Sequence, residues 1–560
     1  MCKSWCADFE TTSVTNLEKD GYVRVWLWSL VSAEEHQREY YGTTLESFID
    51  KVFEVGAKRV FFHNLRFDGY FILDWLLSNG YVYGTDFKTL ISELNVWYEL
   101  SIIRGKQTVK FWDSLKKFPG QSVNSIAKMY SIEGKKEKPY FDLYRPLDYQ
   151  PTLEEVEYCL QDSRIIAYAT WKNEESGNVG ITLSSDAFNE VKQTIGGYKY
   201  YRNWMPVLNP ATDDFCRLSY KGGWTYLRKD RAEKLYNNVS VYDVNSLYPW
   251  AMAETELPYG RPAIRKPKGG EMYIIKFVAD FDIKPNKLPT IQVKNMPTVY
   301  KKTEYIEHST VDTELCLTNI DYALFEEHYD INWMSEPEYL VFRSKVGLLK
   351  PYIDYWMDVK EKATIEHDES LRYMAKRKMN SPYGKTGMKP KRYNKIPKAG
   401  ENIVDLTELE ENTTDPIYVP YASFVCAQAR NKTIRSAQQE YDNFIYADTD
   451  SLHLLGDSHD ELEIHPTKLG AWKHEGTFEL AKYLRPKTYI HAHNGSNGIV
   501  VDEIKCAGMQ DEVKAICTWD DFKIGTTFPK ARKLQKRVKG GLVLVDEDFT
   551  IKDNGFTTRF

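Results

Sequence analysis

Strand-like and helix-like segments alternate through the first 180 residues of the chain. Residues 4–12, 24–30 and 59–62 carry the apolar, aromatic and β-branched side chains that favour strands. A turn at residues 63–69 leads into a helix-like segment from Tyr70 to Leu77. Apolar residues then recur at helical spacing from Thr152 to Asp162. This part of the chain is therefore expected to form a mixed α/β domain.

The second half of the chain also mixes the two patterns. Val239 to Asp243 alternates and is rich in β-branched residues, which predicts a strand. Pro249 is expected to end this extended segment and to let the chain turn into a helix from Trp250 to Glu256. Residues 370–379 predict a further helix, and apolar residues on both sides of Asp448-Thr-Asp450 predict a β-hairpin with acids at its tip.

Length and composition indicate several folded domains. A chain of 560 residues is too long for one hydrophobic core. With 42% hydrophobic and 28% charged residues, it has the balance of a soluble globular protein. It contains no run of 18 apolar residues and no apolar segment at its start, so neither a membrane span nor a secretory signal is expected. The eight cysteines form no CxxC pair, which favours buried thiols in a reducing cytoplasm.

Charge is unevenly distributed along the chain. The net charge is −6, yet Arg372 to Lys398 holds ten basic residues and no acidic one. Lys530 to Lys539 adds six more. Each run alone is compatible with a solvated face. Two such runs flanking metal-type carboxylates favour contact with phosphates, and 39 tyrosines and 14 tryptophans provide surfaces on which bases could stack.

The N-terminal part contains an ordered set of acidic residues. Asp8 and Glu10 lie two apart on a predicted strand, so both side chains point to one face. Asp68 follows in the turn, and Tyr158 and Asp162 are four apart on a predicted helix. A lone Asp-x-Glu is usually a surface pair. Four carboxylates from strand, turn and helix can instead hold two divalent cations about 4 Å apart, as phosphodiester hydrolysis requires.

A second set of acids lies in the C-terminal half. Asp243 ends a predicted strand, just before Asn-Ser-Leu-Tyr248-Pro249. Asp448-Thr-Asp450 forms the predicted hairpin tip about two hundred residues later. An isolated Asp-Thr-Asp is compatible with an ordinary acidic turn. Its pairing with the upstream Asp243 segment indicates a second metal centre.

The first set resembles the three exonuclease motifs of the DEDDy proofreading nucleases, which have a ribonuclease-H-like fold. The resemblance implies that Asp8, Glu10, Asp68 and Asp162 bind metal and that Tyr158 positions the attacking water. It also implies a set of residues that hold the single-stranded primer end, namely Asn64, Phe67, Ser114 and Leu115. Lys138 is the candidate for a lysine that assists hydrolysis, with Lys135 and Lys136 as alternatives.

The second set resembles motifs A and C of family B DNA polymerases, here DxxSLYP and YxDTDS. The resemblance implies that Asp243, Val244 and Asp450 hold the two catalytic metals and that Asp448 supports them. The implied reaction is attack of a primer 3′ hydroxyl on the α-phosphate of a dNTP. Two Mg²⁺ (or Mn²⁺) ions are expected in each active site, because Mg²⁺ accepts carboxylate and phosphate oxygens.

Further motifs of the same family surround these acids. Residues 376–385, KxxxNSPYGK, resemble motif B of the fingers. The resemblance assigns nucleotide contacts to Lys360, Lys376, Asn380 and Tyr383, and places Tyr248 beneath the deoxyribose, where it would exclude a 2′ hydroxyl. Two more motifs imply DNA contacts: KxY for the primer terminus and YxGG for the template. Their residues here are Lys487 and Tyr489, and Tyr220, Gly222 and Gly223.

Several strings outside these motifs resemble the protein-primed family B DNA polymerases of small tailed phages. They lie at 63–69, 113–117, 288–292, 327–330, 505–509 and 540–546. The family implies a terminal protein as primer, template and primer DNA, single-stranded DNA as a further ligand, and action in the cytoplasm of an infected bacterium. The chain would be a monomer or a heterodimer with the terminal protein. A ring closed around DNA would explain processivity and strand displacement.

The resemblance also implies the fold class and its divisions. The fold expected is α/β and α+β, with a ribonuclease-H-like 3′–5′ exonuclease domain before a palm, fingers and thumb that carry two insertions. The expected parts are exonuclease 1–180, linker and first palm segment 181–254, first insertion 255–351, fingers 352–385, second insertion 386–416, second palm segment 417–517, and thumb with C-terminal tail 518–560.

Three departures from the relatives stand out. Arg377 and Lys378 replace apolar residues of motif B, and Pro382 replaces a leucine. A solvated helix face is the favoured interpretation of the charged pair, with an added phosphate clamp as the alternative. Three other functions stay open at this point: a nuclease with an inactive polymerase half, a DNA-primed polymerase without terminal protein, and a non-catalytic single-strand-binding protein.

Overall fold

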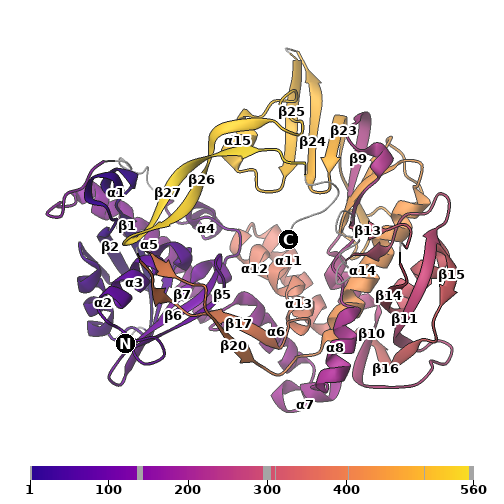
Figure 1. Cartoon of the computed structure of the whole chain (residues 1–560), viewed down its shortest axis with the longest axis horizontal. Helices are drawn as coiled ribbons and strands as arrows, with labels where there is room; N and C mark the ends of the chain where they lie inside the picture. Colours follow the sequence, from indigo (N-terminus) through magenta and orange to yellow (C-terminus); the bar gives the residue numbers. More distant parts are fainter. Residues whose placement is uncertain are drawn as a thin grey trace.

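The computed structural model describes residues 3–134, 143–293, 304–309, 311–401, 403–496 and 498–553 (Figure 1). The N-terminal part is built on a seven-stranded sheet of order β3-β2-β1-β4-β7-β6-β5. Neighbouring β1, β4 and β7 run parallel, and the remaining pairs are antiparallel. The strands are β1 Ser4–Thr11, β2 Val25–Ser32, β3 Glu39–Gly42, β4 Arg59–Phe62, β5 Phe87–Glu93, β6 Val96–Arg104 and β7 Gln107–Asp113.

Helices cover this sheet and complete its α/β character. Their bounds are α1 Val14–Asp20, α2 Leu45–Glu54, α3 Leu65–Ser78, η1 Ser114–Lys116, α4 Val123–Met129 and α5 Leu153–Glu175. The long helix α5 packs on β1 and β2, where the Ser29 hydroxyl donates to the Cys159 carbonyl (2.9 Å). It begins with a capping box between Thr152 and Glu155, which satisfies backbone N–H groups that the first helical turn leaves unpaired.

Three helices lead from the N-terminal domain to a second seven-stranded sheet: α6 Leu183–Thr194, α7 Gly197–Trp204 and α8 Pro210–Leu218. The central sheet is antiparallel throughout, of order β25-β24-β23-β9-β22-β21-β8. Its strands are β8 Thr225–Leu227, β9 Leu235–Val244, β21 Phe444–Asp448, β22 Ser451–Leu455, β23 Trp472–Arg485, β24 Thr488–Gly495 and β25 Gly498–Cys506. The short η2 Lys229–Arg231 and the helix α9 Leu247–Glu254 flank β9.

A third sheet lies beyond α9, with β10-β16-β11-β14 in order and β15 paired to β11. It comprises β10 Glu256–Ala263, β11 Met272–Ile283, β14 Thr313–Thr318, β15 Tyr329–Met334 and β16 Glu338–Val346, with α10 Asn319–His328. Beside this sheet, β12 Ile291–Gln292 pairs with β13 Tyr305–Ile306. Then come α11 Lys350–Ile365, α12 Glu369–Asn380, α13 Pro382–Thr386 and the buried α14 Val419–Gln439.

Two hairpins return to the N-terminal domain. One contains β17 Lys391–Lys395, β18 Lys398–Ala399, β19 Val404–Asp405 and β20 Leu409–Thr413. The other follows α15 Asp511–Ile516 and pairs β26 Thr527–Val538 with β27 Gly541–Thr550. In Figure 1 this second hairpin crosses from the top of the molecule to the N-terminal domain. The Lys539 carbonyl at its tip accepts from the backbone N–H of Val23 (3.0 Å).

The structure confirms the predicted strands at 59–62 and 239–243 and the predicted helix at 370–379, and it corrects two helix starts. Helix α3 begins at Leu65 rather than Tyr70, because Asn64 adopts a left-handed conformation (φ 81°) that turns the chain at once. Helix α9 begins at Leu247, before Pro249, since proline is tolerated in a first helical turn. The seven described cysteines are buried and form no disulfide. No described helix is long and apolar enough to cross a membrane.

Candidate active sites

Three of the N-terminal acids, Asp8, Glu10 and Asp68, lie close together in the structure. Asp8 and Glu10 project from β1, and Glu10 is buried. Asp68 lies in the first turn of α3 and is also buried. Burial and the negative charges of Asp8 and Glu10 raise the pKa of Asp68 well above its usual value. Asp162 is buried on α5. Cations bound among these oxygens would stabilise the ionised carboxylates, because they would offset the repulsion that raises the pKa of Asp68.

Sequence reasoning missed Cys159 in this cluster. Its sulfur, one carboxylate oxygen of Asp8 and one of Glu10 all lie within 4.8 Å of one another. The thiol also contacts the Asp8 carbonyl at 3.7 Å. Burial and the acidic neighbours raise the pKa of Cys159 well above its usual value, so it is a neutral thiol here. No local pattern marks this cysteine, because it follows Tyr158 on a helix that folds against β1 only in three dimensions.

Asp113 organises the residues assigned to the single strand. Its Oδ1 accepts backbone N–H groups from Asn64 (3.1 Å), Leu65 (3.4 Å) and Leu115 (3.0 Å). One carboxylate thus ties the start of α3 to the segment after β7. The sequence contained a signal for Asp113, which is an N-cap residue directly before Ser114, but its long-range bonds to Asn64 and Leu65 could not be predicted.

The remaining N-terminal candidates occupy the same region. Ser114 is fully buried, and its hydroxyl bonds the Nδ1 of His63 (2.8 Å). Phe67 is half-buried and lies one turn before Phe71, with ring centroids 5.8 Å apart. Tyr158 is 3% exposed on α5. Lys138 and its alternatives Lys135 and Lys136 lie outside the described residues.

Asp243 and Asp450 meet at adjacent strands of the central sheet. Asp243 pairs with Ser451 across β9 and β22, and the Val244 N–H donates to the Asp450 carbonyl (2.7 Å). Thr449 adopts a left-handed conformation (φ 63°), which makes the hairpin turn tight. Burial and the charge of Asp450 raise the pKa of Asp243 to about 7, while Lys376 lowers it. The pKa of Asp450 is raised by burial and by Asp448.

Asp448 is held differently from the other two. It accepts the Thr225 hydroxyl (2.8 Å), the Tyr446 hydroxyl (3.2 Å) and the ammonium of Lys487 (2.8 and 3.0 Å). The Lys487 backbone N–H in turn donates to the Tyr446 hydroxyl (3.0 Å). The ring of Tyr489 packs 5.6 Å from that of Tyr446. Asp448 therefore links the hairpin tip to the KxY segment.

Of the nucleotide candidates, Lys376 and Tyr383 lie close to this pair of acids. Tyr248 of α9 stacks on Tyr383 of α13, with ring centroids 4.3 Å apart. Lys376 and Asn380 lie about one turn apart on α12, where the Asn380 amide donates to the Lys376 carbonyl (2.8 Å). Burial lowers the pKa of Lys360 on α11, and the nearby cation of Lys376 lowers it further.

The interpretation of Arg377 and Lys378 as a solvated face is wrong, and so is the alternative phosphate clamp for Lys378. Lys378 is 1% exposed, forms an ion pair with Glu190 and lies 4.5 Å from the Trp356 ring centroid. Arg377 donates to the Pro119 carbonyl of the N-terminal domain (2.7 Å). Both side chains point to partners that come from distant parts of the sequence, which the helix pattern could not reveal.

Of the residues Tyr220, Gly222 and Gly223, Gly223 lies against Thr449 of the Asp448–Asp450 turn, whereas Tyr220 lies against Gly387. A side chain at Gly223 would meet Thr449 at 2.6 Å, so only glycine fits there. The Thr449 N–H donates to the Trp224 carbonyl (2.8 Å). Arg430 donates to the Gly222 carbonyl (2.7 Å), which holds the YxGG segment against α14. Gly223 thus supports the hairpin turn directly, and Gly222 anchors the segment to α14.

Both acid clusters fit divalent cations. Among the described residues, Asp243 Oδ1 is a buried carboxylate oxygen that accepts no hydrogen bond. A buried carboxylate oxygen left in this state is costly unless a cation binds it. The donor set consists of carboxylate oxygens, which suit Mg²⁺. An antiparallel sheet with paired aspartates, a neighbouring helix that bears lysines and a pair of stacked tyrosines together define the active site of a nucleic-acid polymerase.

Comparison with known proteins identifies the family. Residues 144–468 match the family model "DNA polymerase type B, organellar and viral". The DNA polymerase of Bacillus phage phi29 is 36% identical, over 98% of this chain and 99% of that protein. The solved phi29 DNA polymerase with primer-template DNA and incoming nucleotides is similar over 99% of this chain and all of that chain, with 35% identity and a TM-score of 0.90. The same polymerase with single-stranded DNA gives 34% identity and a TM-score of 0.88, over 99% of this chain and all of that chain.

The chain therefore belongs to the type B DNA polymerases and, within them, to the phi29-like phage enzymes. It is a DNA-directed DNA polymerase that depends on divalent metal and uses dNTP substrates. The comparisons confirm the predicted fold class, a mixed α/β multidomain protein with exonuclease and polymerase domains.

Proposed function

We propose that this polymerase replicates a linear phage genome, starting on a terminal protein, displacing the non-template strand and proofreading with its own 3′–5′ exonuclease. The observation that carries the proposal is the presence of two carboxylate clusters on two different sheets. The first cluster consists of Asp8, Glu10, Asp68 and Asp162, and the second consists of Asp243 and Asp450. The resemblance of each cluster to a separate set of motifs supports a division between removal and addition of nucleotides.

For polymerisation, Asp243, Val244 and Asp450 would hold the metal ions, which stabilise charge on the triphosphate and activate the primer hydroxyl. Lys376 and Lys360 bind and orient the phosphates as compact cations. Asn380 and Tyr383 contact the nucleotide, and the ring of Tyr248 fills the space that a 2′ hydroxyl would need. Lys487 and Tyr489 hold the primer end, and Asp448 positions Lys487 through their ion pair.

For proofreading, Asn64, Phe67, Ser114 and Leu115 hold the unpaired end, and Tyr158 orients water. Lys138 keeps its proposed role as an assisting lysine on the resemblance alone. The four acids would hold two cations, which supply hydroxide and stabilise the leaving oxygen. The phi29 polymerase complex with single-stranded DNA supports this assignment by similarity.

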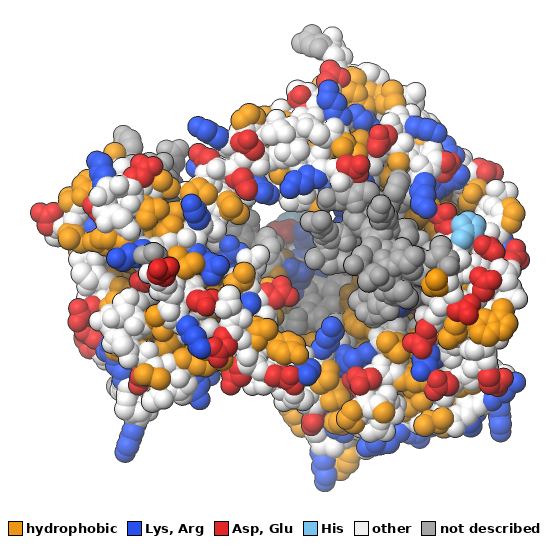
Figure 2. All heavy atoms as spheres, viewed as in Figure 1, with side chains coloured by type: hydrophobic (Ala, Val, Ile, Leu, Met, Phe, Trp, Pro, Cys, Tyr) orange, Lys and Arg blue, Asp and Glu red, His pale blue; other side chains and the backbone are white. Residues whose placement is uncertain are grey.

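Contacts of the two hairpins support the strand-displacement proposal. The tip of β26–β27 reaches the N-terminal domain, where the Gly540 N–H donates to Asp74 (3.3 Å). Asn394 of β17 bonds the backbone of Thr89 (2.9 Å) and Ile91 (2.7 Å) on β5. Arg537 of β26 donates to the Val404 carbonyl of β19 (3.3 Å). Figure 2 shows the molecule hollowed beside the hairpin, with both basic and acidic side chains around the hollow. A closed path of this kind would retain template DNA and separate the strands.

The proposed parts keep the ranges expected from sequence: exonuclease 1–180, linker 181–254, first insertion 255–351, fingers 352–385, second insertion 386–416, second palm segment 417–517 and thumb 518–560. The first insertion would contact the terminal protein and the duplex. The enzyme would act as a monomer or as a heterodimer with that protein, with Mg²⁺ or Mn²⁺, in an infected bacterial host. Similarity to phage DNA polymerases supports the phage setting, and the other points rest on the resemblance to the protein-primed family.

Two variants test the division of labour. Asp8→Ala with Glu10→Ala should abolish 3′–5′ degradation of a labelled single strand while primer extension survives. Asp450→Ala should show the reverse. Equal loss of both activities in either variant would contradict the two-site proposal. Incubation with labelled dATP and the cognate terminal protein should label that protein covalently, and an unlabelled partner would favour a DNA-primed enzyme.

A further inference from the structure

Helix α12 carries two residues, Tyr373 and Arg377, that contact the N-terminal domain, in addition to the nucleotide candidates. Lys376 and Asn380 share one helix face with Tyr373 and Arg377, because residues three and four apart are neighbours on a helix. Tyr373 and Arg377 reach the N-terminal domain. The Pro119 carbonyl accepts two hydrogen bonds, from the Tyr373 hydroxyl (3.0 Å) and from Arg377 Nη2 (2.7 Å). The two donors also meet each other, with Arg377 Nε 3.4 Å from the Tyr373 hydroxyl.

Pro119 belongs to the loop that holds the single-strand candidates Ser114 and Leu115. His63 pins both ends of this loop, through the Ser114 hydroxyl (2.8 Å) and the Gln121 carbonyl (2.9 Å). The Phe118 N–H donates to the Ser114 carbonyl (2.9 Å), so the loop is a compact turn. A shift of Pro119 is therefore transmitted to Ser114 through a short, bonded segment.

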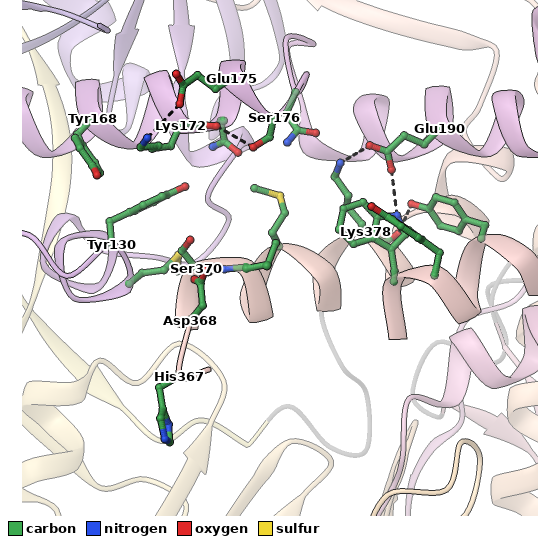
Figure 3. Close-up of a pocket in the computed structure, with 18 of the residues that line it drawn as sticks. Tyr130, Tyr168, Lys172, Glu175, Ser176, Glu190, His367, Asp368, Ser370 and Lys378 are labelled. Atoms are coloured by element: carbon green, nitrogen blue, oxygen red, sulfur yellow. Dashed lines mark hydrogen bonds and ion pairs between the residues drawn. The ribbon is translucent and has the colours of Figure 1, made fainter. Parts of the chain in front are cut away.

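The contact between α12 and this loop is narrow. Tyr373 packs against the hydrophobic cluster of the N-terminal domain that contains Phe118 and Ile126. Next to it lies a cavity of about 900 Å³, lined from α5 and α6 on one side and from α11 and α12 on the other. Figure 3 shows Tyr130 between Tyr168 and Ser370 in this space, with Lys172 on the side of α5. Helix α12 is thus held to the loop at Pro119, while the ion pair between Lys378 and Glu190 holds it to α6.

We propose that Tyr373 and Arg377 are positioning residues that couple the nucleotide-binding helix to the strand-holding loop of the exonuclease. The shared Pro119 carbonyl orders both sides at once: it holds α12 with Lys376 and Asn380 in place, and it holds Ser114 and Leu115 in place. Because the contact orders both segments, its loss weakens binding at both sites. The inference rests on the proposed proofreading function.

Arg377→Leu tests the coupling, because leucine keeps the helix and removes the charged donor. Its KM for a single-stranded oligonucleotide in the degradation reaction should rise about threefold or more, with kcat within twofold. In an Asp8→Ala, Glu10→Ala background, its KM for dNTP in primer extension should rise as well. Tyr373→Phe keeps the packed ring and the bond from Arg377 to Pro119 and loses only the two bonds of the hydroxyl, so both KM values should rise less. Lys362→Leu, which removes an exposed cation from α11, is the matched control and should change neither KM.

The outcomes separate the two proposals. Absence of degradation by the wild-type enzyme would refute proofreading itself. Wild-type degradation with both KM values unchanged in Arg377→Leu and Tyr373→Phe would refute the coupling alone. A fall in exonuclease kcat at constant KM would also refute it, because that pattern reports damage to the metal site. Thermal unfolding of each variant shows whether the fold is intact. If Arg377→Leu unfolds, Tyr373→Phe decides.

Discussion

The rings of Tyr248 and Tyr383 stack with centroids 4.3 Å apart and planes inclined by 14°. The two residues are 135 positions apart and come from α9 and α13. Both rings are half-buried beside the Asp243 and Asp450 pair. Tyr248 is therefore held rigidly by Tyr383, and a rigid ring can exclude a hydroxyl where a mobile one would yield.

Tyr248→Val should weaken sugar discrimination. The smaller valine side chain leaves room for a 2′ hydroxyl, and it cannot stack on the ring of Tyr383. We expect the ratio of kcat/KM for dNTP over rNTP to fall about tenfold or more, measured by single-nucleotide primer extension. Tyr248→Phe keeps the stacked ring and should retain most of the ratio. An unchanged ratio in Tyr248→Val would exclude this residue as the sugar filter.

Gly540→Ala should reduce processivity. Gly540 has a φ of +90°, and an added Cβ would lie 1.9 Å from the Val23 carbonyl oxygen, so the hairpin tip must leave the N-terminal domain. We expect shorter products in extension with a competitor DNA trap, with little change in single-nucleotide addition. Gly525→Ala is a matched control, since its φ of +92° is equally unfavourable for alanine but its Cβ would meet nothing within 4 Å. Equal product lengths in both variants would contradict the ring proposal.

Stability should fall at acidic pH because of a buried histidine. His453 bonds the Tyr483 hydroxyl (2.8 Å), which also contacts Nε2 of His491 (3.0 Å). Burial and the neighbouring His491 hold the pKa of His453 well below its usual value. The unfolded chain, with a histidine pKa of about 6.5, then binds the extra proton first, so stability is complete above about pH 6.5 and is lost as pH falls towards the folded-state pKa.

The melting temperature recorded from pH 8 to pH 5 measures this loss. His453→Gln should show a flatter profile, because it removes one buried group that must stay neutral in the folded state. His36→Gln changes an exposed histidine and serves as control. Identical slopes in wild type and His453→Gln would assign the acid sensitivity to other groups.

Local patterns predicted much of the candidate sites. The two-residue period of a strand placed Asp8 and Glu10 on one face, and the four-residue spacing placed Tyr158 and Asp162 on another. The hairpin with Asp448 and Asp450 was also predictable, because apolar strands flank a short acidic turn. These features involve residues that are close in the sequence, so the geometry of a strand, helix or hairpin is enough to place their side chains relative to one another.

Features that depend on distant partners could not be predicted. Asp113 bonds Asn64 and Leu65 across nearly fifty positions, and Cys159 reaches the acids only when α5 packs on β1. The wrong interpretation of Lys378 has the same origin. Helical periodicity says which residues share a face, but not that Glu190 and Trp356 cover that face.

By itself, then, the sequence determined several strands and helices around the acids, the two sets of acids and, through its motifs, the family. The tertiary structure decided what each side chain meets: Lys487 neutralises Asp448, Tyr383 supports Tyr248, and Arg377 ties α12 to Pro119. The reason is physical. Secondary structure follows from local backbone preferences, whereas burial, ion pairing and pKa shifts depend on which segments the folded chain brings within a few ångströms of one another.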